Sequence, residues 1–320
     1  MFNKWMTIFK NEKIAKYWTP ILLIILLLFF GIQFPTFLSF TNIQNLLKQM
    51  SILLIAGMGM SMIIIMGSID ISVGACITFT GAITAMATPH LGIWAIFIGI
   101  LVGAGVGFLN GFLATLLKIP TFLSTIAMMM ILNGVSVLLL KGSPFNIDSE
   151  PFLMVSKGNA IFGIPNIVFI PLVIVIFTIF FLRNTTFGRS LYAIGSNEYV
   201  AEYSGINVVK MQIATFAIHG SFIGLAGALQ ASLLEAGCPY MGDTYTLSTV
   251  AVVVMGGIAL SGGRGTPIGT LLGAVLITVL ISGLNFMGVT PEIRNVAMGV
   301  LIIFGALVSN MGRPKSLIVK

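Results

Sequence analysis

Between Asp70 and Lys118 the chain reads ISVGACITFTGAITAMATPHLGIWAIFIGILVGAGVGFLNGFLATLL, which is 47 residues without a charged side chain. One helix crosses the hydrocarbon of a bilayer with about 20 apolar residues. The stretch is therefore long enough for two membrane helices, and the turn-forming sequence TPHLG at residues 88–92 marks the break between them. The fold is predicted to be all-α and polytopic.

The composition of the whole chain agrees with this prediction. Of 320 residues, 57% are hydrophobic and 8% are charged, and the mean hydropathy is +1.07. Soluble domains are about 25% charged, so a soluble enzyme, a nucleic-acid-binding domain and a disordered chain are excluded. The long apolar runs also exclude a membrane β-barrel, whose strands alternate. The net charge of +7 is interpreted as basic loops on the cytoplasmic side of a membrane, with no nucleic-acid partner.

Charged residues divide the rest of the chain into uncharged runs of 18 to 31 residues. These runs bring the predicted count to about ten transmembrane helices in a single membrane domain, residues 1–320. Residues 1–16 carry four lysines and are expected to form a cytoplasmic lead-in to an uncleaved first helix. An even number of crossings puts both termini on the same side, which we expect to be the cytoplasm.

The distribution of basic residues supports this orientation. With a cytoplasmic N-terminus, twelve Lys and Arg residues fall on the inner side and four on the outer side. Two hydrophilic segments are long, namely the outer residues 141–165 and the inner residues 183–210. Both are too short to be soluble domains, so soluble machinery must be a separate chain.

Several polar residues interrupt the apolar runs. Asp70 lies in GSIDISVG, residues 67–74, where glycine and serine favour irregular backbone. Either this segment is a turn that lines or gates a path, or it is an ordinary inner loop in which Asp70 caps the next helix. His219 is expected to be structural, because a proton relay would need more acids within the spans. The candidate residues of a translocation path or gate are Asp70, Ser72, Asn110, Asn133 and Ser261.

Glycines recur at helical spacing in three places. The longest series is Gly99, Gly103, Gly107 and Gly111, and shorter ones occur at residues 220–228 and 269–273. Small residues let helices approach closely in lipid, and packing within the chain is favoured here over a subunit interface. A further glycine cluster at residues 256–265 matches residues 67–74 as G-x-I-x-(I/L)-S-x-G. This match leaves open whether the chain contains an internal repeat.

The chain has no nucleotide-binding motif and no metal-binding cluster. The dipeptide Gly-Lys does not occur, which excludes a Walker A loop, and G-x-G-x-x-G does not occur either. Cys76 and Cys238 are interpreted as small apolar residues, and no cofactor is expected. If ATP drives this protein, another subunit binds it.

Four segments resemble a known family. They occur in the expected order and together cover about residues 40–310. The family is that of ABC importer permeases of the ribose type, to which autoinducer-2 and nucleoside permeases are related. The matching segments are residues 186–197 (TFGRSLYAIGSN) with 204–208 (SGINV), residues 67–74, residues 109–111 with 119–122, and residues 261–266 (SGGRGT).

The resemblance implies a membrane subunit that works as a pair, a homodimer or two close paralogues, in a bacterial inner membrane. A separate ATPase with two nucleotide-binding halves would dock on residues 183–210, and an extracytoplasmic sugar-binding protein would deliver a monosaccharide, ribose being the commonest label. Glu202 departs from the family pattern, which usually has alanine there. The residues expected to couple to the ATPase are Gly188, Arg189, Ala193, Ile194, Gly195, Asn197, Glu198, Glu202 and Gly205.

Two other classes of function remain as alternatives. A secondary transporter driven by protons or sodium would need ionisable residues at mid-membrane, which are scarce. An intramembrane enzyme would need paired carboxylates, zinc ligands or a Ser/His set, and none lies within the spans. Within the resembling family, a permease for autoinducer-2 or nucleosides is the alternative to one for a monosaccharide.

Overall fold

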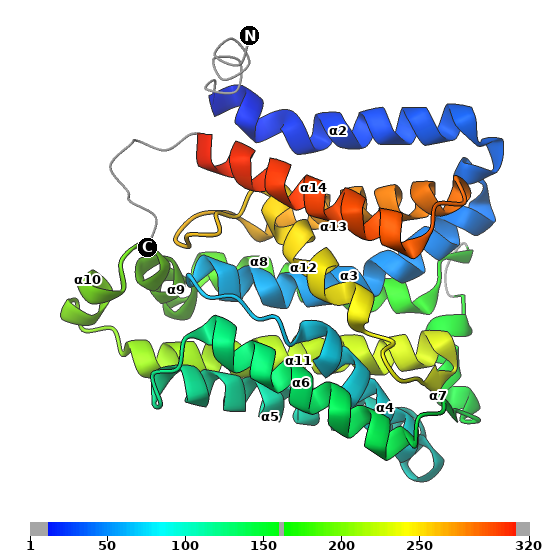
Figure 1. Ribbon diagram of the computed structural model, residues 1–320, viewed down its shortest axis with the longest axis horizontal. Coiled ribbons are helices and arrows are strands. Elements are labelled where there is room, and N and C mark those ends of the chain that lie inside the picture. Colours follow the sequence, from blue (N-terminus) through cyan, green and yellow to red (C-terminus); the bar gives the residue numbers. More distant parts are fainter. Residues whose placement is uncertain (1–11, 160–162, 312–320) are drawn as a thin grey trace.

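A computed structural model describes residues 12–159 and 163–311, and helices dominate this part of the chain (Figure 1). Most helices lie roughly side by side. The segment with α9 and α10 projects at one end of the bundle, and α7 lies at the other. These are called the α9 end and the α7 end below. The helices are α2 (Glu12–Gln33), α3 (Phe40–Ile65), α4 (Val73–Leu91), α5 (Ala95–Thr115), α6 (Thr121–Leu140), α7 (Glu150–Lys157), α8 (Phe169–Asn184), α9 (Thr186–Ser196), α10 (Glu198–Tyr203), α11 (Val208–Leu234), α12 (Asp243–Met255), α13 (Pro267–Phe286) and α14 (Pro291–Met311).

The helical, multi-spanning character is as predicted, whereas the count of about ten crossings is not confirmed. Six segments of the described chain are long and apolar enough to cross a membrane, and one of them, Val73–Thr115, contains both α4 and α5. The uncharged run between Asp243 and Arg264 was expected to hold a full crossing. Its helix α12 has 13 residues, because a glycine-rich loop occupies the rest of the run. A helix of that length is too short to span the hydrocarbon alone.

The break predicted at residues 88–92 is present. Helix α4 continues through Pro89 to Leu91, and Gly92 then adopts a φ of 53°. The chain turns there through the short 3₁₀ helix η2 (Gly92–Trp94) into α5. Left-handed backbone is accessible to glycine at little cost, which explains why the turn falls at this residue.

Helices α5 and α11 cross at glycines. A Cβ on Gly103 would meet the main chain of Gly220 and Gly224, and a Cβ on Gly220 would meet Gly103 in return. Gly99, Gly107 and Gly111 also face α11. The prediction that these glycines pack within the chain is therefore confirmed. Close backbone approach maximises dispersion contact where lipid provides no hydrophobic driving force.

Helices α4 and α12 meet at their N-terminal ends, near the middle of the bundle (Figure 1). The contact is reciprocal: the Gly74 N–H donates to Thr246 Oγ1 at 3.2 Å, and the Gly242 N–H donates to Thr78 Oγ1 at 2.9 Å. In each helix the threonine follows the glycine by four residues. From this point α4 runs to the α7 end and α12 to the α9 end (Figure 1). The two helix starts therefore share the same glycine–threonine spacing and the same type of contact.

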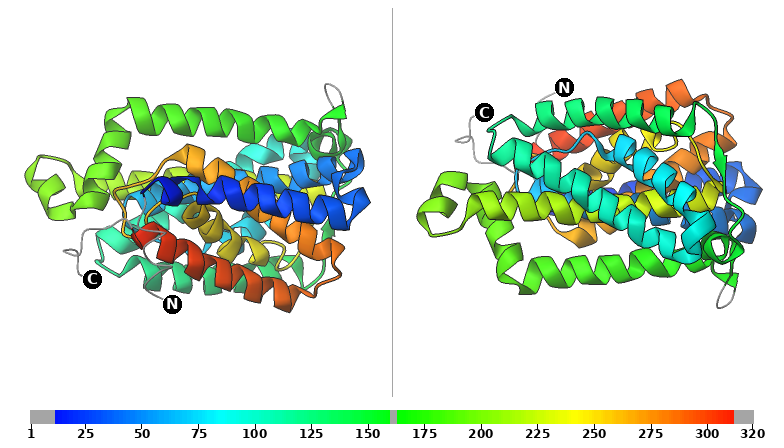
Figure 2. Two further views of the ribbon diagram at one scale, coloured as in Figure 1. Left: turned by 90° about the horizontal axis from the view of Figure 1, so that it is seen from above. Right: turned by 90° about the horizontal axis from the view of Figure 1, so that it is seen from below.

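The segment expected to form an outer loop packs at the α7 end. Its strand β1 (Phe145–Asn146) pairs antiparallel with β2 (Ala236–Gly237), Phe145 opposite Gly237. Helix α7 is tied to α11 by the ion pair Lys157–Glu235 at 2.7 Å. Residues 160–162 of this segment lie outside the described part, as do residues 1–11 of the N-terminal lead-in. Helix α8 lies along one long side of the bundle and α14 toward the other (Figure 2).

Candidate functional site

A buried polar network surrounds Asp70 in the turn between α3 and α4. Its Oδ1 accepts hydrogen bonds from the Ser72 N–H at 2.7 Å and from Ser72 Oγ at 2.6 Å. Asn110 of α5 donates through Nδ2 to Ser72 Oγ at 3.0 Å and to Asp70 Oδ2 at 3.4 Å. His219 of α11 places Nε2 3.4 Å from Asp70 Oδ2. The network therefore joins the turn to two helices far away in the sequence.

Burial bears on both interpretations of Asp70. The side chains of Asp70, Ser72, Asn110 and His219 are all buried, so the turn is not an ordinary surface loop. Asp70 accepts a backbone hydrogen bond as the capping hypothesis required, although Ser72 and not Asp70 is the N-cap of α4. The sequence singled out each of these four side chains separately, but it did not indicate that they meet.

The other two residues predicted for a path or gate lie elsewhere. Asn133 is on α6, and its Oδ1 is buried without a hydrogen-bond partner. Ser261 is exposed in the loop after α12, toward the α9 end. The structure thus brings together three of the five predicted residues and adds His219.

The segment expected to contact an ATPase forms two short helices at the α9 end. Thr185 caps α9 by accepting from the Gly188 N–H at 3.1 Å, and Asn197 caps α10 by accepting from the Val200 N–H at 3.2 Å. Asparagine is a favoured N-cap residue, which explains why α10 begins there. Of the nine predicted coupling residues, Gly188 and Ile194 are buried, Ala193 and Gly195 are partly buried, and the exposed ones are Arg189, Asn197, Glu198, Glu202 and Gly205.

Gly195, one of the predicted coupling residues, packs against other segments of this chain. A Cβ at this position would clash with Ile65 O at the end of α3 and with the Gly263 N–H. The same Gly263 N–H donates to Ile65 O at 2.8 Å. We call residues 65–67, 195 and 261–263 the glycine junction.

The Tyr192 hydroxyl donates to Gly265 O at 2.8 Å and adds a second link between α9 and the loop after α12. Burial raises the pKa of this phenol, which keeps it a proton donor. Helix α9 is thus connected directly to the end of α3 and to the loop that follows α12.

Sequence reasoning missed the exposed apolar side chains of α10. Tyr203 is 93% exposed, Tyr199 67% and Val200 59%. A cluster of this kind on a helix that projects from the bundle marks an interaction surface. The two tyrosines of the six-residue segment EYVAEY were the available signal, because tyrosine is enriched at interfaces.

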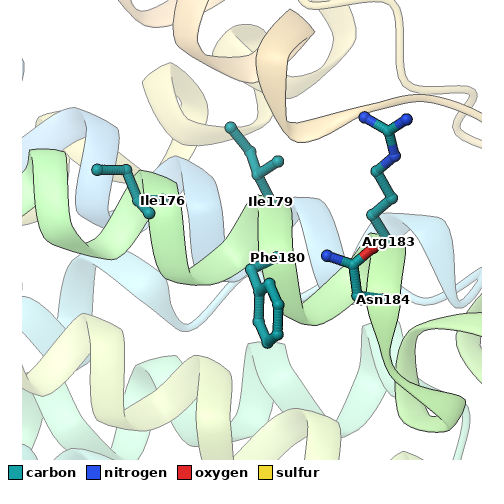
Figure 3. Close-up of a pocket in the computed structure, with 5 residues that line it drawn as sticks. All are labelled: Ile176, Ile179, Phe180, Arg183 and Asn184. Atoms are coloured by element: carbon teal, nitrogen blue, oxygen red, sulfur yellow. The ribbon is translucent and has the colours of Figure 1, made fainter.

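Two hollows are present on the described surface. One is a groove along α8 in which Ile176 and Phe180 accompany Arg183 and Asn184 (Figure 3). Ile176 is 68% exposed, and this face of α8 is suited to lipid. The other hollow is a cavity of about 330 Å³ with polar side chains from five helices, namely α3, α11, α12, α13 and α14.

A bundle of apolar helices with mid-depth helix starts, a buried polar turn and projecting short helices defines a membrane permease. The family model described as "Branched-chain amino acid transport system / permease component" matches residues 42–306, and the chain belongs to this family.

Alignments with ribose and galactose import permeases cover about nine tenths of the chain. The chain is 32% identical over 296 residues to the ribose import permease protein RbsC of Escherichia coli (strain K12), covering 91% of this chain and 92% of that protein. It is 35% identical over 290 residues to that of Bacillus subtilis (strain 168), covering 89% of each. It is 30% identical over 312 residues to the galactose/methyl galactoside import permease protein MglC of E. coli (strain K12), covering 91% and 93%.

Proposed function

We propose that this chain is the membrane permease subunit of an ATP-driven importer of a monosaccharide. The observation that carries the proposal is the arrangement of the α9–α10 segment. It presents exposed tyrosines outside the bundle, and through Gly195 it packs against the end of α3 and the loop after α12. Near-full-length similarity to ribose and galactose import permeases supports a sugar as the solute.

The coupling mechanism follows from these contacts. A separate ATPase with two nucleotide-binding halves would grip α10 through Val200 and Tyr203, with Glu198 and Glu202 as polar neighbours. Movement of α9 would then pass directly to the end of α3 and to the loop after α12, since Gly195 leaves no free space there. Packed interiors transmit such displacements because they are dense.

In this proposal the α9 end is cytoplasmic and the α7 end is extracytoplasmic. The inner side then holds twelve of the sixteen basic residues, including those at both termini. The α7 end would meet a soluble sugar-binding protein, and a second permease copy would complete the path in a bacterial inner membrane.

The family description names amino acids, so the choice of a sugar needs its own argument. An amino acid carries both an ammonium and a carboxylate, and a site for it needs a group of each sign. The cavity at the α7 end has Arg294 but no acidic side chain in its lining. A lining with these charges favours a neutral solute. Permeases for autoinducer-2 or nucleosides remain alternatives to a monosaccharide permease.

The test is uptake by proteoliposomes that contain the permease, its ATPase and its binding protein. D-[¹⁴C]ribose uptake is expected to require ATP and to persist when ionophores collapse the proton and sodium gradients. D-galactose and L-leucine serve as comparison solutes. Uptake that ionophores abolish despite ATP would identify a secondary transporter, and uptake of leucine alone would exclude the sugar assignment.

A further inference from the structure

The short helix α12 leaves a cavity at the α7 end of the bundle. The cavity lies beside the first turns of α12, which begins near the middle of the bundle (Figure 1), and side chains of α3, α11, α13 and α14 complete its lining. The rim is open, since Gln49, Thr244 and Asn285 are exposed. The deeper wall is formed by Gln230, Ser248 and Thr278, which are 7%, 7% and 4% exposed. A path thus leads from the surface to buried polar groups.

Two polar atoms in this lining have no protein partner. Thr278 Oγ1 and Arg294 Nε are both buried and make no hydrogen bond. Arg294 is held in place because its Nη1 donates to Asn285 Oδ1 at 2.7 Å. A buried polar group without a partner is unfavourable for folding, so its persistence inside a cavity points to a ligand that satisfies it.

The chemistry of the lining fits a polyhydroxylated ring. Amides and hydroxyls can both donate and accept, as sugar hydroxyls do, and Tyr245 already donates to Gln230 Oε1 at 2.9 Å. Leu53 and Ile281 supply apolar surface for the C–H face of a ring. The volume of about 330 Å³ lies at the lower end of small-molecule sites, which suits one monosaccharide.

We propose that this cavity is a binding site on the transport path. It holds one neutral monosaccharide through Thr278, Ser248, Gln230 and Arg294. The inference rests on the proposed import function and deepens it, because it assigns substrate contacts to the permease itself. The lining holds a single cation and no acidic side chain, which disfavours an amino acid, and its many neutral donors disfavour a simple anion site.

The first experiment compares Thr278→Val with Thr270→Val in the reconstituted transporter. Both threonines lie on α13, and both have a buried Oγ1 without a partner, but only Thr278 lines the cavity. Valine keeps the shape and removes the hydroxyl. ATP-driven uptake of D-ribose or D-galactose at low concentration is expected to fall about three- to tenfold for Thr278→Val alone. Melting temperatures in detergent are expected to stay level or rise for both variants.

Equal uptake by the two variants would contradict the proposed sugar site in the cavity and would leave the proposed import function unaffected. Absence of ATP-driven uptake of either sugar by the unmodified transporter would instead overturn the function. A fall in uptake matched by a fall in melting temperature would assign Thr278 a structural role and contradict the proposal.

The second experiment detects occupancy directly and does not need transport. Thr244→Cys at the rim, in a Cys238→Ser background, is treated with a methanethiosulfonate reagent in the assembled transporter. D-ribose or D-galactose is expected to slow the reaction, while Ser143→Cys outside the cavity reacts at an unchanged rate. Protection by inorganic phosphate or leucine and not by the sugars, or no protection at all, would overturn the proposal.

Discussion

At the scale of single residues, Asp70 holds three segments together because its carboxylate is a shared acceptor. Ser72 supplies two donors, and Asn110 reaches it from α5. The ring nitrogens of His219 have no hydrogen-bond partner, although Nε2 is within 3.4 Å of the carboxylate. At this depth the alternative to such contacts is a buried group without a partner, so loss of the acceptor affects every donor around it.

Asp70→Asn is expected to be tolerated and Asp70→Leu is not. The asparagine keeps one acceptor for Ser72, and its amide can donate to Asn110 Oδ1, which has no partner now. The expected loss of stability is about 1 kcal/mol for asparagine and about 3–5 kcal/mol for leucine, which removes one member of a buried pair. Thermal unfolding in detergent measures both.

ATP-driven uptake by the asparagine variant is expected to fall only modestly. If uptake disappears while the melting temperature stays near that of the parent, the charge itself operates a gate, and the role of Asp70 as a structural acceptor is wrong.

At the scale of elements, the α5–α11 crossing depends on which face of α5 carries each glycine. Gly103 faces the backbone of α11 at Gly220 and Gly224, whereas nothing lies within 4 Å of a Cβ placed on Gly105. The two positions are two residues apart on one helix, so they share local sequence and differ in packing. Contact with another backbone leaves no side chain that can move aside.

Gly103→Ala is expected to destabilise the protein by about 1–3 kcal/mol through overpacking. Gly105→Ala is the matched control and is expected to be neutral or stabilising by up to about 1 kcal/mol, because alanine favours a helix. Chemical or thermal unfolding in detergent distinguishes them. Equal melting temperatures for the two variants would show that the crossing is not close-packed.

Much of the order and position of the helices was predictable, because the length of an uncharged run and the spacing of glycines are properties of the local sequence. The run that holds α4 and α5, the turn at Gly92 and the N-cap at Asn197 all follow from nearby residues. The short length of α12 could not be predicted, since its run has the length of a crossing, yet a glycine-rich loop occupies the part of the run that follows Met255.

The candidate sites were harder to predict for the same physical reason. The partners of Asp70 lie 40 and 149 positions away, and the cavity draws on five helices. Only packing brings such residues together, and no local pattern encodes their distance. Gly195 was predicted only as a coupling residue, and its close packing against Ile65 O, 130 positions away, could not be inferred from the sequence.

At the scale of the whole molecule, the bundle has two unlike ends. The α7 end carries the β1–β2 pair and the Lys157–Glu235 ion pair. The α9 end carries the projecting pair of short helices and the glycine junction (Figure 1). Different surfaces at the two ends are what a subunit needs if it meets a different soluble partner on each side of a membrane.

Cysteine labelling in intact cells tests this orientation. In a Cys238→Ser background, an impermeant thiol reagent is expected to label Ser143→Cys at the α7 end and not Ser196→Cys at the α9 end. Both positions are exposed in the chain, so accessibility from the medium is the difference measured. Permeabilised cells provide the control, in which both should react. Labelling of Ser196→Cys in intact cells would reverse the topology.

The meeting of α4 and α12 at Gly74 and Gly242 also has an electrical consequence. Each helix start carries a partial charge of roughly +0.5. An acidic side chain lies at each start, namely Asp70 two residues before the Ser72 N-cap of α4 and Asp243 in the first turn of α12. A negative charge thus meets the positive end of each helix dipole, which lowers the electrostatic cost of beginning two helices inside the bundle.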